Sequence, residues 1–141
     1  MDIRYLTETY AVSPQIAPED VATLREAGFT TIICNRPDSE IGEDLAADVI
    51  AATSEALGLK FVVNPVSPGM LSFDNVTTQR DAVDDADGPV FAYCKSGNRS
   101  SIVWALSQAG RMPTDEMIAT AAKFGYNLEP YRDQIEALAA S

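Results

Sequence analysis

Short runs rich in β-branched and aromatic residues alternate along this sequence with longer stretches in which apolar residues recur at helical spacing. The runs lie at residues 29–34, 60–64 and 89–93, and each of them predicts a buried strand. The stretches between them are long enough for a helix to cross from one strand to the next. Because such crossovers join parallel strands, the sequence predicts an α/β fold with a mostly parallel sheet of about four to five strands flanked by helices.

Glycine, proline and capping residues set the expected ends of the helices. These helices lie near residues 18–27, 45–57, 72–87, 100–109, 114–124 and 127–138. No repeat, low-complexity tract or linker-like composition interrupts the pattern. Residues 1–141 are therefore expected to form a single domain.

Composition excludes several classes of function. Acidic residues outnumber basic ones by 21 to 10, giving a net charge of −11, so neither nucleic acid nor an anionic membrane is expected as a partner. The sequence has no histidine, which excludes Ser-His-Asp triads, Cys-His pairs and metal sites that depend on imidazole. We expect neither a metal nor a cofactor.

The sequence also favours one compartment. The N-terminal stretch MDIRYLTETY lacks the apolar core of a signal peptide, and no apolar run approaches the roughly 18 residues of a membrane span. Two cysteines are too few for a disulfide framework and suit a reducing environment. A cytoplasmic protein is therefore expected.

One segment between a predicted strand and a predicted helix concentrates reactive and charged side chains. Its residues are Cys94, Lys95, Ser96, Gly97, Asn98, Arg99 and Ser100. Ligands of parallel sheets bind outside the carboxyl ends of the strands, which is where this loop lies. A tight turn from strand to helix directs main-chain N–H groups inward and adds the positive end of the helix dipole. A cysteine facing these groups is stabilised as a thiolate nucleophile.

The neighbours of the cysteine suit an anionic substrate. Arg99 can donate two hydrogen bonds to one anion, and Ser100 can donate its hydroxyl to the Cys94 sulfur. We therefore predict Cys94, Arg99 and Ser100 as catalytic residues. The expected substrate-binding residues of the loop are Lys95, Ser96, Gly97 and Asn98.

Arg36 follows the neighbouring predicted strand, at the same edge of the sheet. It is expected to line the same pocket and to bind substrate, with Asp38 or Glu40 pairing with it or with Arg99. The other interpretation, a turn whose charges are solvated, stays open.

The pattern Cys-x-x-Gly-x-Arg-Ser resembles the active loop of rhodaneses and that of cysteine-dependent phosphatases. Three blocks, TTIICNRPDSE, FVVNPVSPG and PVFAYCKSGNRSS, together resemble a bacterial family, the beta-lactamase hydrolase-like protein, phosphatase-like domain. The resemblance covers roughly residues 5–106. It implies a fold like that of dual-specificity phosphatases, in a family of which some members are labelled sulfur transferases.

Two departures from the phosphatase pattern favour sulfur chemistry. Four residues separate Cys94 from Arg99, where phosphatases have five, and among related loops the shorter length accompanies sulfur transfer. The loop expected to hold a general acid, residues 65–72, contains none, although Asp74 or Asp38 could serve. We therefore expect a sulfurtransferase that carries sulfane sulfur as a Cys94 persulfide, between a small anionic donor such as thiosulfate or glutathione persulfide and a thiol acceptor.

Two alternatives remain. The first is a cysteine-dependent phosphatase that acts on a phosphate substrate through a phosphocysteine. The second is a non-catalytic sensor of anions or persulfides. The other cysteine, Cys34, ends a predicted strand and is expected to be a small buried apolar residue rather than a resolving thiol.

Overall fold

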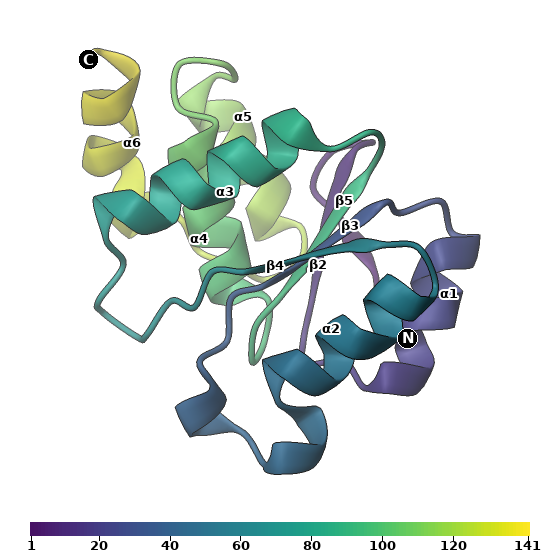
Figure 1. Ribbon diagram of the computed structural model, residues 1–141. Coiled ribbons are helices and arrows are strands. Elements are labelled where there is room, and N and C mark those ends of the chain that lie inside the picture. Colours follow the sequence, from purple (N-terminus) through teal and green to yellow (C-terminus); the bar gives the residue numbers. More distant parts are fainter.

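Five strands form one sheet in the order β1-β2-β5-β3-β4 (Figure 1). In the computed structural model, which describes residues 1–141, the strands are Arg4–Tyr5 (β1), Tyr10–Ser13 (β2), Thr31–Cys34 (β3), Lys60–Val63 (β4) and Val90–Tyr93 (β5). β1 pairs antiparallel with β2, and the other three pairings are parallel. The predicted α/β fold with a mostly parallel sheet is confirmed.

Six α-helices connect and cover the strands. They span Val21–Glu26 (α1), Ala47–Ala56 (α2), Phe73–Asp85 (α3), Asn98–Ser107 (α4), Thr114–Ala122 (α5) and Arg132–Ala139 (α6). Each was expected, although short 3₁₀ turns at Pro18–Asp20, Glu43–Leu45 and Glu129–Tyr131 stand where α1, α2 and α6 were expected to begin. α4 begins two residues earlier than expected. None of the helices is both long and apolar enough to cross a membrane.

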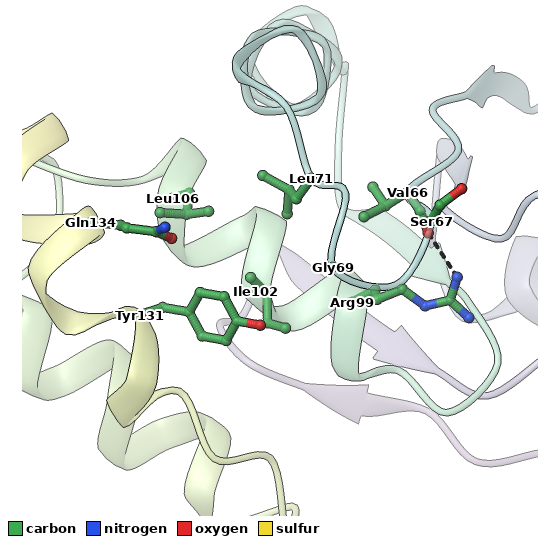
Figure 2. A pocket seen from close by; sticks show the side chains of 9 residues that line it. All are labelled: Val66, Ser67, Gly69, Leu71, Arg99, Ile102, Leu106, Tyr131 and Gln134. Atoms are coloured by element: carbon green, nitrogen blue, oxygen red, sulfur yellow. Dashed lines mark hydrogen bonds between the residues drawn. The ribbon is translucent and has the colours of Figure 1, made fainter.

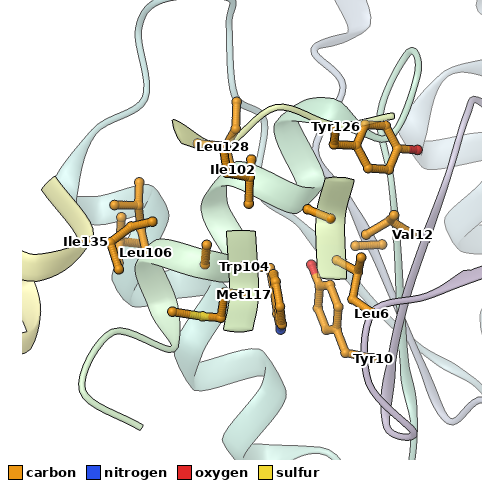
Figure 3. Close-up of a cluster of buried hydrophobic side chains, with 14 of the residues drawn as sticks. Leu6, Tyr10, Val12, Ile102, Trp104, Leu106, Met117, Tyr126, Leu128 and Ile135 are labelled. Atoms are coloured by element: carbon orange, nitrogen blue, oxygen red, sulfur yellow. The ribbon is translucent and has the colours of Figure 1, made fainter. Parts of the chain in front are cut away.

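The helices cover both faces of the sheet, α1 and α2 on one and α3 to α6 on the other (Figure 1). Two apolar cores result. The larger, drawn in Figure 3, joins α3 to α6 to the sheet around Trp104 and Tyr10, whose rings stack at 5.9 Å. β5 contributes to both cores because successive side chains of a strand face opposite sides: Val90 and Ala92 enter one, Phe91 and Tyr93 the other.

The first two strands were not located from the sequence. β2 has only four residues, all buried, and it lies between β1 and β5 in the sheet. The three residues before it, Thr7 to Thr9, are polar and give no alternating pattern from which a strand would be predicted. β2 matters for the site because Ser13 pairs with Tyr93, which brings the loop after β2 beside the loop after β5.

Truncating a side chain of the larger core should lower the stability of the protein. Trp104 is 1% exposed, so we expect Trp104→Ala to lower the free energy of unfolding by about 3–5 kcal/mol through lost contacts and a residual cavity. Urea unfolding followed by circular dichroism measures this. Phe73, 67% exposed, is the matched control, and Phe73→Ala should change stability by less than about 0.5 kcal/mol. Equal losses in the two variants would contradict this assignment of the core.

Candidate active site

The candidate site is built on the turn from β5 into α4. Cys94 directly follows β5, and Gly97 adopts a left-handed conformation with φ of 97° immediately before α4 begins. In that conformation the N–H of Gly97 donates to the Cys94 sulfur at 3.1 Å. The Cys94 side chain is buried but belongs to neither apolar core. The sulfur therefore faces the main chain of its own loop.

Tyr126 explains why position 97 accepts only glycine. A methyl group at Gly97 would overlap the Tyr126 hydroxyl, in addition to the strain of a left-handed backbone. That hydroxyl donates to the Ser96 carbonyl at 2.8 Å and accepts from Arg4 Nη1 at 2.6 Å. Neither Tyr126 nor Arg4 was predicted from the sequence. They come from opposite ends of the chain and clamp the outside of the loop.

Several main-chain donors of the loop have no acceptor in the protein. They are the N–H groups of Lys95, Ser96, Arg99 and Ser100. The N–H of Asn98 donates instead to Ser96 Oγ at 3.2 Å, and the side chains of Lys95, Ser96 and Asn98 are exposed. Unpaired N–H groups at a strand-to-helix turn form a binding site for an anion.

Arg99 lies in the first turn of α4, where Glu40 holds its guanidinium. Nη1 and Nη2 donate to the two carboxylate oxygens of Glu40 at 2.8 and 2.7 Å, and Nη1 also donates to the Val66 carbonyl at 2.7 Å. These contacts use three of the five N–H donors of an arginine. The Nε–H and the second Nη2–H remain, and together they form a parallel pair that suits a phosphate or carboxylate.

Glu40 also joins Arg36 to the site. Arg36 Nε lies 3.4 Å from Glu40 Oε1, and its Nη2 donates to the Glu40 carbonyl at 3.0 Å. One carboxylate thus lies between two guanidinium groups, and Arg99 first, with Arg36, lowers the pKa of Glu40. Glu40, not Asp38, is therefore the partner of Arg36 and links it to Arg99, while a role of Arg36 in binding substrate stays a prediction.

Ser100 makes a different hydrogen bond from the expected one. Its buried hydroxyl donates to Asn35 Oδ1 at 2.9 Å, so the predicted hydrogen bond to the Cys94 sulfur is absent. The reason is a buried amide network that needs this proton. Asn35 Nδ2 donates to Gln79 Oε1 at 3.0 Å, and Gln79 Nε2 donates to the Tyr10 hydroxyl at 2.8 Å. The network fixes α4 to α3, β2 and the end of β3, and it was not predicted.

Cys34 and Tyr93 lie away from the Cys94 sulfur. Both belong to the core beneath α1 and α2, which is on the other side of β5. Cys34 Sγ donates to the Arg36 carbonyl at 3.3 Å, and burial raises the pKa of this thiol. The structure thus supports the interpretation of Cys34 as a buried apolar residue.

A cavity of about 130 Å³ adjoins Arg99 (Figure 2). Its walls come from the loop after β4, from α4 and from the segment leading into α6. The lining residues are Val66, Ser67, Gly69, Leu71, Arg99, Ile102, Leu106, Tyr131 and Gln134. Figure 2 shows that the guanidinium points toward Val66 and Ser67, away from Tyr131 and Gln134. The cavity therefore adjoins the stem of Arg99 rather than its free donors.

Adding a methyl group at position 97 should weaken anion binding by the loop. Gly97→Ala should weaken the binding of inorganic phosphate at least about tenfold, because it displaces an N–H donor and the Tyr126 hydroxyl. Isothermal titration calorimetry measures the affinity. Gly58→Ala is the matched control, since Gly58 has a φ of 83° with open space around it. Both variants should lose stability, but a loss of phosphate affinity in both would contradict the role assigned to Gly97.

Glu40 predicts a pH-dependent contribution to stability. Because folding lowers the pKa of Glu40, its contribution is fully present above the ordinary value of 4.5 and is lost as the pH falls through the lower folded value. Glu40→Gln should therefore destabilise the protein at about pH 7, and the difference from the parent should shrink toward about pH 3. Urea unfolding at both pH values tests this, with the exposed, unpaired Glu55→Gln as control. A difference that does not change with pH would contradict the charge pairing.

Comparisons with known proteins assign the chain to a family. The family model for the beta-lactamase hydrolase-like protein, phosphatase-like domain, matches residues 2–111. A curated beta-lactamase hydrolase-like protein of Xylella fastidiosa is 29% identical over 130 residues, covering 91% of this chain. The chain spans only 30% of that relative's length.

Solved structures agree with the family model. A candidate phosphatase from Neisseria meningitidis is 35% identical and covers 98% of this chain and 99% of its own, with a TM-score of 0.82. PTPMT1 in complex with PI(5)P has a TM-score of 0.77 at 13% identity, covering 97% and 98%, and shows the shared fold alone. The predicted phosphatase-like fold is confirmed, whereas nothing in these comparisons supports the sulfurtransferase that we expected from the short loop. The chain belongs to the phosphatase-like domain family of beta-lactamase hydrolase-like proteins.

Proposed function

We propose that this domain is a cysteine-dependent phosphatase that hydrolyses phosphate monoesters through a phosphocysteine at Cys94. One observation carries the proposal: the buried sulfur lies in a loop with unpaired main-chain N–H groups, and the adjoining Arg99 keeps a parallel pair of donors free. A transferring phosphoryl group has three equatorial oxygens that need such donors. Family membership supports the same activity.

The residues have separate tasks in this mechanism. Cys94 attacks phosphorus as the thiolate, and the N–H groups of the loop bind the phosphoryl oxygens. Arg99 binds two of these oxygens through Nε and Nη2, while Glu40 and the Val66 carbonyl hold its other donors. Lys95 adds positive charge at the exposed mouth of the loop. The mechanism requires no metal or cofactor.

The proposal predicts which cysteine is essential. Cys94→Ser should reduce the turnover of 4-nitrophenyl phosphate at least about a thousandfold, because an unactivated hydroxyl replaces a thiolate. Cys34→Ala should retain activity, since Cys34 lies in the core on the other side of β5. Release of nitrophenolate, followed by absorbance, measures both. Equal activity of the Cys94→Ser variant and the parent would contradict the proposal.

The covalent intermediate distinguishes the proposed phosphatase from the other interpretations. We expect intact-mass spectrometry of acid-quenched protein to show one phosphoryl group, located on Cys94 by peptide mapping. One added sulfur after exposure to thiosulfate, with no hydrolysis of aryl phosphate, would instead support sulfur transfer. Phosphate binding without any covalent adduct or turnover would indicate a module that only binds anions.

A further inference from the structure

The carboxylates around the loop decide how a leaving group can depart. Five segments contact residues 94–100. One is β2, where the Tyr10 hydroxyl donates to the Ser100 carbonyl at 3.2 Å and so has its proton already engaged. Ser13–Gln15 lies beside Lys95, the segment after β3 contacts Ser100 and Arg99, the segment after β4 contacts Arg99, and Tyr126 contacts Ser96. On these segments the acidic side chains are Asp38 and Glu40, both after β3. A proton donor to a leaving oxygen has to come from this small set or from the loop itself.

Glu40 has no proton to give near neutral pH. Both of its carboxylate oxygens accept hydrogen bonds from Arg99, and one of them also lies 3.4 Å from Arg36 Nε. Protonation would leave two guanidinium groups without their counter-ion, which is why the pKa of Glu40 is lowered. Glu40 therefore positions Arg99 and stays ionised.

Asp38 is committed to another element. Its Oδ1 accepts the main-chain N–H of Ala47 at 2.9 Å, at the N-terminus of α2. Asp38 is thus a helix cap, not a residue turned toward Cys94.

Three more groups could donate a proton, and none is held in place to do so. Lys95, in the loop itself, has an exposed side chain that no hydrogen bond or ion pair fixes above the Cys94 sulfur. Tyr126 already donates its hydroxyl proton to the Ser96 carbonyl while it accepts from Arg4. Asp74 lies in the first turn of α3, and its side chain is exposed to solvent. Asp74 and Asp38, the two acids considered from the sequence, therefore both lie on helix N-termini.

We infer that this site acts on phosphate monoesters whose leaving oxygen departs as an anion without a proton from the protein, which means aryl rather than alkyl phosphates. The inference rests on the proposed phosphatase function and narrows its substrate class. Enzymatic proton donation contributes about 10²–10⁴-fold to such a step. A phenoxide spreads its charge over the ring and can leave without that help, whereas an alkoxide cannot.

The reaction balances with water alone. The Cys94 sulfur bonds to phosphorus as the bond from phosphorus to the leaving oxygen breaks, and the electron pair of that bond leaves with the phenoxide. The phenoxide then takes a proton from solvent water. A second water attacks phosphorus and the sulfur–phosphorus bond breaks, which regenerates the Cys94 thiolate and releases inorganic phosphate carrying the protons of that water.

Leaving-group dependence tests the inference. We would measure kcat/KM of the purified protein for phenyl phosphates substituted to vary the acidity of the phenol, and for benzyl phosphate as the alkyl counterpart of similar shape. We expect kcat/KM to fall about tenfold for each unit by which the pKa of the phenol rises, because a full negative charge develops on the leaving oxygen. Benzyl phosphate should react at least about a thousandfold more slowly than phenyl phosphate.

Two variants, Glu40→Gln and Asp74→Asn, distinguish a residue that positions Arg99 from one that donates a proton to the leaving group. Glu40→Gln loosens Arg99 and should lower kcat/KM by a similar factor for every substrate, so that its plot against phenol pKa runs parallel to that of the parent. Asp74→Asn should match the parent in both rate and slope. A steeper plot for either variant would identify that residue as a proton donor and would overturn the inference.

The remaining outcomes are also distinct. A fall of less than about twofold per pKa unit, with benzyl phosphate turned over readily, would show that the protein protonates the leaving group, and it would overturn this inference while leaving the proposed function intact. Failure to hydrolyse even 4-nitrophenyl phosphate would overturn the proposed function and this inference together.

Discussion

The hydrogen bond from the Gly97 N–H to the Cys94 sulfur is the contact on which the rest of the site depends. It exists because the chain turns back at Gly97 in a left-handed conformation, which directs this N–H inward and lets α4 begin at the next residue. The same turn places Arg99 in the first turn of α4. A side chain at position 97 would disturb the backbone, the Tyr126 hydroxyl and the start of the helix at once.

One carboxylate, that of Glu40, holds two of the positively charged side chains of the site in place. The chain has a net charge of −11, yet Arg36, Lys95 and Arg99 gather at one edge of the sheet. Glu40 lies between two of them and is partly buried with them, at 23% exposure against 11% and 13% for the arginines. A partly buried cation needs such a partner, because desolvation otherwise opposes its charge. Glu40 meets this need by binding the end of Arg99 and leaves free the side that can bind an anion.

The sequence predicted the parts of the fold and site that are local in the chain. β3, β4 and β5 and the turn at Cys94 follow from hydrophobic runs and glycine placement within a few residues. β2 was missed because its sequence, YAVS, holds only two β-branched or aromatic residues, one fewer than each of the strands that were predicted. Tyr126 was missed because its contact with Ser96 joins distant segments. The hydrogen bond of Ser100 was wrongly predicted because it depends on Asn35 and Gln79, which come from two other elements. Asn35 directly follows a buried strand, and a polar amide there was the available signal.

The length of the short loop alone favours sulfur transfer, and the geometry explains why this length does not decide the chemistry. Removing one residue between cysteine and arginine shortens the chain by up to about 3.5 Å. In this loop α4 begins at Asn98, so Arg99 is the second residue of the helix. From that position its long side chain extends to Glu40 and to the Val66 carbonyl. Four main-chain N–H groups nevertheless remain unpaired. A cysteine persulfide presents one anionic sulfur atom, whereas a transferring phosphoryl group presents three oxygens that can use several main-chain donors together with the free side of an arginine. The number and kind of unsatisfied donors therefore indicate the substrate class more directly than the spacing of the motif does.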